Sequence, residues 1–213
     1  MLCQTAIVYD RRIGDETLSF GHEGILYRRS FIMYDKQKGS LWVHTTGEAI
    51  NGPYKGKVLK FLPCSVMPWK RWKERHPDTT VLTGQRGAPH MGRYGLAEDP
   101  EKYGLSVGQS EAPKLYPIAL LAKQRVVNDT LDGTPIVVLW DDVSKSGKAY
   151  ERGERTFAWR DGKIVDQSGM TWDVLRGLSE QRKATRLKER VSTPWLIQRW
   201  KGFYPKGTIH AAK

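Results

Sequence analysis

Short segments in which apolar positions alternate with polar ones or run together recur along the whole chain, each bounded by Gly, Asp or Pro. Such segments are typical of β-strands, because alternation puts the apolar side chains on one face of the strand. Asp161-Gly162 predicts a hairpin turn, since a type I′ turn needs positive φ at both central residues. The pattern predicts strands over residues 5–10, 17–20, 24–28, 31–35, 40–43, 58–62, 79–83, 135–140, 155–160, 163–166, 171–174, 186–191 and 207–210.

Three short segments have the pattern of helices. Residues 68–75 and 194–201 each begin with a proline, which suits the first turn of a helix. Each segment is followed within a few residues by another proline, which cannot continue a helix. Residues 117–125 are the third candidate. The sequence therefore predicts a mainly β fold, a β-rich α+β class, with a few short helices.

Several motifs occur twice in the same order, about 130 residues apart. Chance similarity would scatter the spacing, so we interpret the motifs as a duplicated unit. The sequence thus predicts two pseudo-symmetric β units, 1–84 and 113–213, packed as one body and joined by a Gly/Pro-rich connector over 85–112. The matched motifs are Thr5-Ala6-Ile7-Val8 with Thr134-Pro135-Ile136-Val137, Trp42 with Trp172, Gly47 with Gly177, Leu59-Lys60 with Leu187-Lys188, and Trp72-Lys73 with Trp200-Lys201.

The matched tryptophans are most simply core anchors, because large aromatic side chains bury the most area per residue. The segment 115–129, which opens the second unit, has its expected counterpart before Met1. We therefore expect the chain to be an N-terminally shortened version of a longer ancestor.

The charge balance changes the list of expected partners. The chain of 213 residues has 35 Lys and Arg against 23 Asp and Glu, a formal net charge of +12. This excess either keeps a β-rich protein soluble or attracts an anionic ligand. The densest basic run, 176–190, aligns with the Gly/Pro-punctuated segment 46–62, so we expect a loop that leads into a strand. Without a named nucleic-acid module, the sequence does not favour a nucleic-acid partner.

Several classes of protein are excluded by composition. With 39% hydrophobic residues the chain can bury a core, which excludes a disordered tail. No apolar run reaches the roughly 18 residues of a membrane span. Two cysteines, Cys3 and Cys64, cannot build a disulfide framework or a four-cysteine zinc site. The opening residues lack a basic stretch followed by an apolar one, so no signal peptide is expected in this chain, and neither a compartment nor an oligomeric state is predicted.

The reactive residue types gather in the first unit. By strand alternation, His44, Thr46 and Glu48 share one face, where they either hold a divalent ion or supply an acid–base pair. A partly exposed strand face without chemistry is the alternative. His22 is a further candidate metal ligand, in a turn beside Glu23. Cys3 is a candidate nucleophile or soft metal ligand, with a buried inert thiol as the alternative.

A series of motifs occurs in order along nearly the whole chain. The motifs are Cys3-Gln4-Thr5-Ala6-Ile7-Val8-Tyr9-Asp10-Arg11, Met33-Tyr34-Asp35-Lys36-Gln37, Ser40-Leu41-Trp42, Thr46-Gly47-Glu48-Ala49-Ile50, Trp69-x-x-Trp72-x-x-x-His76-Pro77-Asp78-Thr79, Tyr116-Pro117, Val127-Asn128-Asp129 and Thr171-Trp172-Asp173. Together they resemble the bacterial and archaeal domain-of-unknown-function family 3179. In the family the first motif usually begins Cys-Pro-x-Cys, of which this chain has the second cysteine, as Cys3. The family carries no established activity, so the resemblance implies the lineage of the fold and not a reaction.

Three functional hypotheses follow. The first is a small-molecule hydrolase for an ester, lactone or amide, metal-assisted or cysteine-assisted. In it Cys3 is the nucleophile or a ligand, His44 the base or a ligand, and Glu48 the orienting carboxylate, with His22, His44 and Glu48 as candidate ligands of a divalent metal ion. The second is a non-enzymatic binding module whose basic loops hold an anionic ligand or partner. The third is a structural domain without retained activity.

Overall fold

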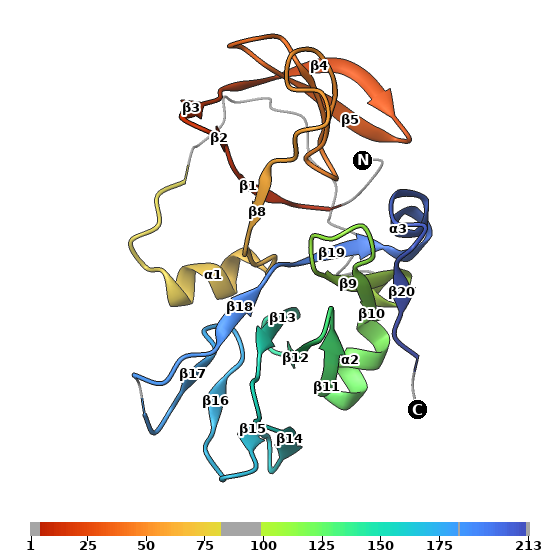
Figure 1. Ribbon diagram of the computed structural model, residues 1–213. Helices are drawn as coiled ribbons and strands as arrows, with labels where there is room; N and C mark the ends of the chain where they lie inside the picture. The colour runs from red at the N-terminus through yellow and green to blue at the C-terminus, as the bar shows by residue number, and fades with distance from the viewer. Residues whose placement is uncertain (1–4, 82–98, 183, 212–213) are drawn as a thin grey trace.

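The computed structural model describes residues 5–81, 99–182 and 184–211, and it consists of two β-rich units (Figure 1). Residues 5–62 form the upper unit of that view, and residues 103–182 and 184–211 form the lower one. The mainly β class is confirmed, since strands predominate over the three α-helices of the described residues. The division of the chain into domains stays a prediction.

The first unit is built from antiparallel strands. Its largest sheet has four strands in the order β4-β5-β6-β7, beside the two-stranded sheets β1-β8 and β2-β3. The core of this unit lies around Leu18, Trp42, Ala49 and Leu59, all fully buried. The strands are β1 (Val8–Asp10), β2 (Arg12–Ile13), β3 (Glu16–Thr17), β4 (Phe20–Tyr27), β5 (Ser30–Asp35), β6 (Leu41–Val43), β7 (Ala49–Asn51) and β8 (Lys60–Leu62).

The second unit holds two four-stranded sheets. One has the order β19-β9-β10-β20, in which β10 and β20 are parallel, and the other is the antiparallel sheet β11-β12-β13-β18. Two hairpins, β14-β15 and β16-β17, complete the unit. The strands are β9 (Tyr103–Val107), β10 (Lys114–Pro117), β11 (Val126–Leu131), β12 (Thr134–Asp141), β13 (Ser146–Glu151), β14 (Phe157–Arg160), β15 (Lys163–Asp166), β16 (Trp172–Asp173), β17 (Leu178–Ser179), β18 (Lys188–Arg190), β19 (Ser192–Leu196) and β20 (Thr208–Ile209).

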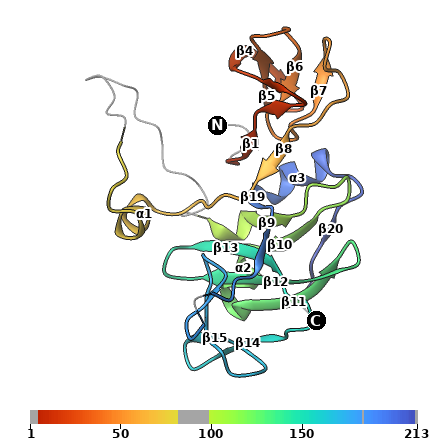
Figure 2. The same ribbon diagram turned by 60° about the vertical axis from the view of Figure 1, so that its left-hand side comes forward.

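The three predicted helices are present as α1 (Trp69–Arg75), α2 (Ile118–Gln124) and α3 (Ile197–Phe203). A single-turn 3-10 helix, η2 (Pro100–Lys102), precedes β9. α2 and α3 pack on the second unit through buried side chains such as Leu121 and Trp200. α1 projects from the side of the molecule (Figure 2) and has no buried residue, so its Trp69 is 52% exposed. Of the matched tryptophans, Trp42, Trp172 and Trp200 are buried, which fits a core role. Their fourth member, Trp72 of α1, is half-buried and does not fit it.

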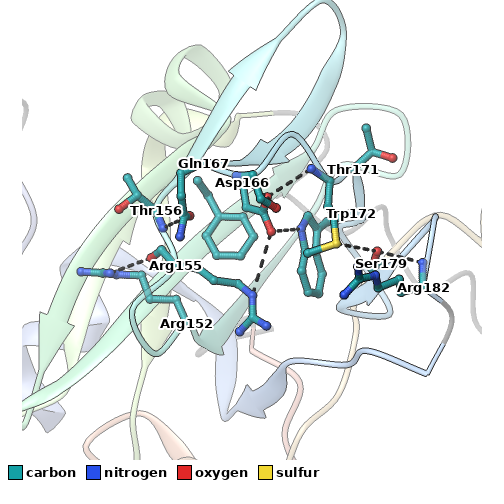
Figure 3. A network of polar contacts seen from close by, with 12 residues as sticks. Arg152, Arg155, Thr156, Asp166, Gln167, Thr171, Trp172, Ser179 and Arg182 are labelled. Carbon is teal, nitrogen blue, oxygen red and sulfur yellow. Dashed lines mark hydrogen bonds and ion pairs between the residues drawn. The ribbon is translucent and has the colours of Figure 1, made fainter.

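The two units share a buried aspartate–tryptophan turn. In the first, Asp35 Oδ2 accepts a hydrogen bond from Trp42 Nε1 at 2.9 Å. In the second, Asp166 Oδ2 accepts one from Trp172 Nε1 at 3.1 Å (Figure 3). Each tryptophan ring also meets a phenylalanine edge to face, at 5.9 Å and 5.6 Å between ring centroids. The carboxylates satisfy backbone and indole donors that would otherwise be buried without partners.

A second shared arrangement joins a tyrosine to a glycine. The Tyr9 hydroxyl donates to the carbonyl of His44, and the Tyr150 hydroxyl donates to the carbonyl of Val174. A Cβ on Gly47 would lie 2.7 Å from the Tyr9 ring, and one on Gly177 would lie 2.5 Å from the Tyr150 ring. Both glycines have positive φ, which glycine adopts without strain.

These contacts change one alignment made from the sequence. The sequence aligns residues 5–8 with residues 134–137 at the start of β12. The contacts instead make Tyr9 of β1 the counterpart of Tyr150 of β13. β1 lies against β8 as β13 lies against β18. The duplication itself stays a prediction.

Several segments differ from the secondary structure predicted for them. Residues 194–196, the predicted start of a helix, belong to β19, so α3 begins at Ile197. Residues 103–107, inside the expected connector, form the fully buried strand β9 between β19 and β10. The glycines there suggested a loop, but Gly104 is required by packing, because a Cβ would lie 2.6 Å from the Leu115 side chain. The strand predicted over 79–83 is wrong for residues 79–81, which form no strand, and residues 82–83 lie outside the described residues.

The basic run from Arg176 to Arg190 contains β17, a turn and β18, with no helix in its described part. This matches the expected loop that leads into a strand. Among the described residues, no helix is long and apolar enough to span a membrane.

Candidate functional site

A cavity of about 300 Å³ lies between the two units. It is lined from both sides, which brings together residues more than half the chain apart. Volumes of about 300–1,000 Å³ are usual for small-molecule sites, so this one is at the lower end of that range. The first unit contributes Arg28, Thr46, Glu48, Val58 and Phe61, and the second contributes Gln109, Ser110, Glu111, Phe203, Tyr204, Pro205 and Lys206.

Gln109 fixes the loop between β9 and β10 against the first unit. Its amide Nε2 donates to the carbonyl of Leu59 at 2.8 Å, and its Oε1 accepts from the backbone N–H of Phe61 at 3.0 Å. The side-chain amide thus forms hydrogen bonds with one backbone carbonyl and one backbone N–H of the segment that leads into β8, as a neighbouring strand would. This clamp sets the distance between the two walls of the cavity.

The wall that faces the first unit is formed in part by the end of α3 and the residues after it. Trp200 is fully buried and donates from Nε1 to Ser106 Oγ at 2.8 Å, which ties the helix to β9. Burial raises the pKa of Tyr204 to about 12, so its hydroxyl is protonated at neutral pH. At the edge, Lys206 forms an exposed ion pair with Glu111 at 2.6 Å.

Glu48 and Thr46 line the cavity, whereas His44 does not. The expectation that strand alternation puts all three on one face is wrong, because β6 ends at Val43 and residues 44–46 form a turn. The Gly47 N–H closes this turn by donating to the carbonyl of Val43 at 2.8 Å. Alternation along a strand therefore stops before His44.

His44 is packed against an aromatic ring. Its imidazole stacks on Phe31 with 4.0 Å between ring centroids, and its buried Nδ1 has no hydrogen-bond partner within the described residues. Burial lowers the pKa of His44 to about 4, because removal from water disfavours the charged form. The imidazole is therefore neutral at physiological pH.

The other predicted residues are not assembled around His44. His22 is exposed, also contacts Phe31, and accepts from the Gly24 N–H through Nδ1 at 3.0 Å. Across residues 5–81, 99–182 and 184–211, no group of three or more His, Cys, Asp or Glu side chains is placed to hold a metal ion. Cys3 lies outside the described residues.

Cys64 was not singled out from the sequence. It is half-buried, with Sγ 3.9 Å from the carbonyl of Ala6. Burial raises the pKa of its thiol, which lowers the thiolate fraction that a nucleophile needs. Sequence reasoning also missed Arg28, Gln109 and the residues after α3, because nothing in their local patterns shows that they meet.

Comparison with known proteins gives one family. Residues 1–102 match the family described as Protein of unknown function (DUF3179). The resemblance expected from the motifs is confirmed over these residues. No curated protein and no solved structure matches the chain.

The DUF3179 match contains one wall of the cavity and not the other. Arg28, Thr46 and Glu48 lie within residues 1–102, whereas Gln109 and the segment after α3 lie beyond them. The extension of the DUF3179 resemblance over nearly the whole chain stays a prediction.

The buried imidazole of His44, which lies within the residues that match the family, gives a stability prediction. The folded pKa of His44, about 4, is below the usual value of 6.5, so the unfolded chain binds the proton more readily. Stability is therefore lost as the pH falls from 6.5 towards 4, by up to about 3 kcal/mol. The variant His44→Phe keeps the ring stack and lacks this loss. Urea unfolding at several pH values measures the difference, and parallel curves for the two proteins would contradict the prediction.

Proposed function

We propose that this protein binds a small organic molecule in the cavity between its two units. The observation that carries the proposal is the composition of the cavity wall. Phe61, Phe203 and Tyr204 offer apolar and aromatic surface, and Thr46 and Ser110 add hydroxyl groups. Ligand sites usually combine a mainly apolar concave wall with a few polar groups that orient the ligand.

Binding without turnover is favoured by the chemistry of the wall. A nucleophilic mechanism needs a hydroxyl or thiol beside a base. Among the described residues that line the cavity, the hydroxyls of Thr46, Ser110 and Tyr204 have no histidine or cysteine beside them. His44 instead packs on Phe31.

Hydrolysis of an ester, lactone or amide is the second candidate. It is supported by Glu48, the predicted catalytic residue that lines the cavity. A carboxylate in this position can orient or deprotonate a water molecule. Glu48→Gln distinguishes the two candidates, because it abolishes turnover of nitrophenyl esters if the cavity is catalytic. If the protein is a binding module, the wild type and the variant show the same background rate.

The binding proposal is tested with N-phenyl-1-naphthylamine, a neutral dye that becomes fluorescent in apolar surroundings. We expect saturable binding by the wild type and binding about tenfold weaker in Phe203→Ala, because a large part of the aromatic wall is removed. Phe203 also contacts Trp195, with 5.7 Å between ring centroids, so this variant loses some stability.

The variant Val58→Trp tests the cavity without the loss of stability expected for Phe203→Ala. Val58 lines the cavity and is 51% exposed, so a larger side chain fills the cavity without disturbing the core. We expect it to block the dye while the melting temperature stays unchanged. The control is Val143→Trp, at a 63% exposed valine outside this cavity, which should bind the dye as the wild type does. Unchanged affinity in both Phe203→Ala and Val58→Trp would contradict the proposal.

A further inference from the structure

The hairpin between β4 and β5 turns through two arginines in left-handed backbone conformations. Tyr27 and Ser30 are the last pair of the ladder, so Arg28 and Arg29 form a two-residue turn. Their φ angles are 49° and 67°. Positive φ at both central residues defines a type I′ turn, for which Asn-Gly or Asp-Gly is strongly preferred.

The same chain makes this turn twice more with the preferred residues. Asp132-Gly133 joins β11 to β12 with φ of 49° and 72°, and Asp161-Gly162 joins β14 to β15 with φ of 49° and 77°. Side chains with a Cβ are disfavoured in this region, most of all without the local hydrogen bonds that Asp or Asn supplies. The arginine pair therefore costs stability that the other two hairpins do not lose.

Such strain is typical of positions where the side chain is needed for a function. Arg28 lines the cavity between the units. Among the described residues it forms no ion pair, and its guanidinium lies over the ring of its neighbour Tyr27, 5.3 Å from the centroid. Arg29 is exposed on the same turn and adds a second positive charge.

The remaining charges of the cavity leave Arg28 as the available cation. Lys206 and Glu111 neutralise each other at the edge, 2.6 Å apart. Glu48 is the opposing charge, and it forms no ion pair with Arg28 within the described part of the chain. An anionic group that enters from the hairpin side therefore meets a guanidinium that, among the described residues, stacks on Tyr27 and pairs with no carboxylate. A guanidinium pairs with carboxylate, phosphate or sulfonate through two parallel hydrogen bonds.

We propose that the ligand of this cavity is an amphiphilic anion, an apolar body that carries one acidic group, and that Arg28 binds the acidic group. This inference rests on the proposed function and specifies its ligand class. Phe61, Phe203 and Tyr204 hold the apolar body, and Arg29 strengthens the positive field at the entrance.

The test compares two dyes with the same ring system. 8-Anilinonaphthalene-1-sulfonate carries an acidic group, and N-phenyl-1-naphthylamine does not. We expect the sulfonate to bind about tenfold more tightly at low salt, and this advantage to fall as NaCl rises from about 0.05 M to about 0.5 M. Competition with benzoate and with phenyl phosphate shows which acidic group is preferred.

The variant Arg28→Asn/Arg29→Gly removes the charges and supplies the preferred turn. We expect it to raise the melting temperature by about 2–4 °C, to lose the advantage of the sulfonate, and to change the affinity for the neutral dye much less than that for the sulfonate. Glu48→Gln should have the opposite effect on the sulfonate, which should bind more tightly once the repelling charge is removed. The control is Lys145→Asn, because Lys145 is an exposed cation with φ of 49° outside this cavity.

The outcomes separate the two proposals. Equal affinity for both dyes, or a sulfonate advantage that survives in Arg28→Asn/Arg29→Gly, overturns the anion inference and leaves the cavity as a binding site. Failure of both dyes to bind overturns the proposed function as well. A loss in Lys145→Asn equal to that in the arginine variant would show attraction by net charge alone and also overturns the inference.

Discussion

Replacing Asp35 with alanine is expected to lower the free energy of unfolding by about 3–5 kcal/mol. The Asp35 side chain is fully buried and accepts three hydrogen bonds, from Trp42 Nε1 at 2.9 Å and from the backbone N–H groups of Lys38 at 2.7 Å and Ser40 at 2.9 Å. Alanine leaves these donors without an acceptor. Urea unfolding followed by tryptophan fluorescence measures the change.

The control for this variant is Asp35→Asn, which keeps the size of the side chain and one acceptor oxygen. We expect it to lose about half as much stability as Asp35→Ala. Asp166→Ala is the matched variant of the second unit, where the carboxylate accepts from Trp172 and from the backbone of Ser168 and Met170. Unfolding of Asp35→Ala at the wild-type urea concentration would contradict the prediction.

The same carboxylates set part of the dependence of stability on pH. Burial by itself raises the pKa of Asp35 and of Asp166, but the hydrogen bonds they accept outweigh it and hold both pKa values below the usual range. A carboxylate with a lowered folded pKa contributes stability above its unfolded pKa, about 4. That contribution is lost as the pH falls through the folded value.

The second large effect is expected at Lys148. Its ammonium group is buried, pairs with Glu189, and donates to the carbonyl of Cys64, which follows β8, at 2.9 Å. Lys148→Met leaves Glu189 without its partner in a mostly buried position, so we expect a loss of about 3 kcal/mol. The lysine joins β13 to the segment that follows β8, and chemical denaturation followed by circular dichroism measures the loss.

Two further variants show whether the loss comes from the unpaired charge. Lys148→Met/Glu189→Gln removes both charges and should recover most of the stability, since buried ion pairs contribute little net stability against uncharged replacements. Lys206→Met breaks the Lys206–Glu111 pair, whose side chains are 71% and 83% exposed, and should change stability by less than about 0.5 kcal/mol. A loss in Lys206→Met equal to that in Lys148→Met would contradict the argument.

The helices could be predicted from the sequence because their limits are local. A proline at the start and another after the end mark 68–75, and α1 begins within one residue of the predicted start. The helix predicted over 194–201 begins three residues late, at Ile197, because Pro194 belongs to β19. The strand β9 could not be predicted, because the role of Gly104 depends on Leu115, which meets it only across the folded sheet.

The candidate site was predicted in part. The sequence identified Glu48 from its residue type. It put His44 on the same face as Glu48 because the strand was predicted to continue past Val43, where β6 ends. The rest of the cavity could not be predicted, because Arg28 and Lys206 are brought together by the packing of the two units. The backbone strain at Arg28 could not be predicted either, because its residue type does not indicate a positive φ.

The shared aspartate–tryptophan turns have a consequence for the order of folding. The residues they join are close in the chain, with separations of 7 for Asp35 and Trp42 and 6 for Asp166 and Trp172, so the entropy lost on closing each loop is small. The Gln109 contacts span 48 and 50 residues and close much longer loops. During synthesis the turn of the first unit is complete before the second unit leaves the ribosome, since a chain emerges from its N-terminus. The cavity is complete only when the residues after α3 have followed, so the proposed ligand site forms later than either aspartate–tryptophan turn.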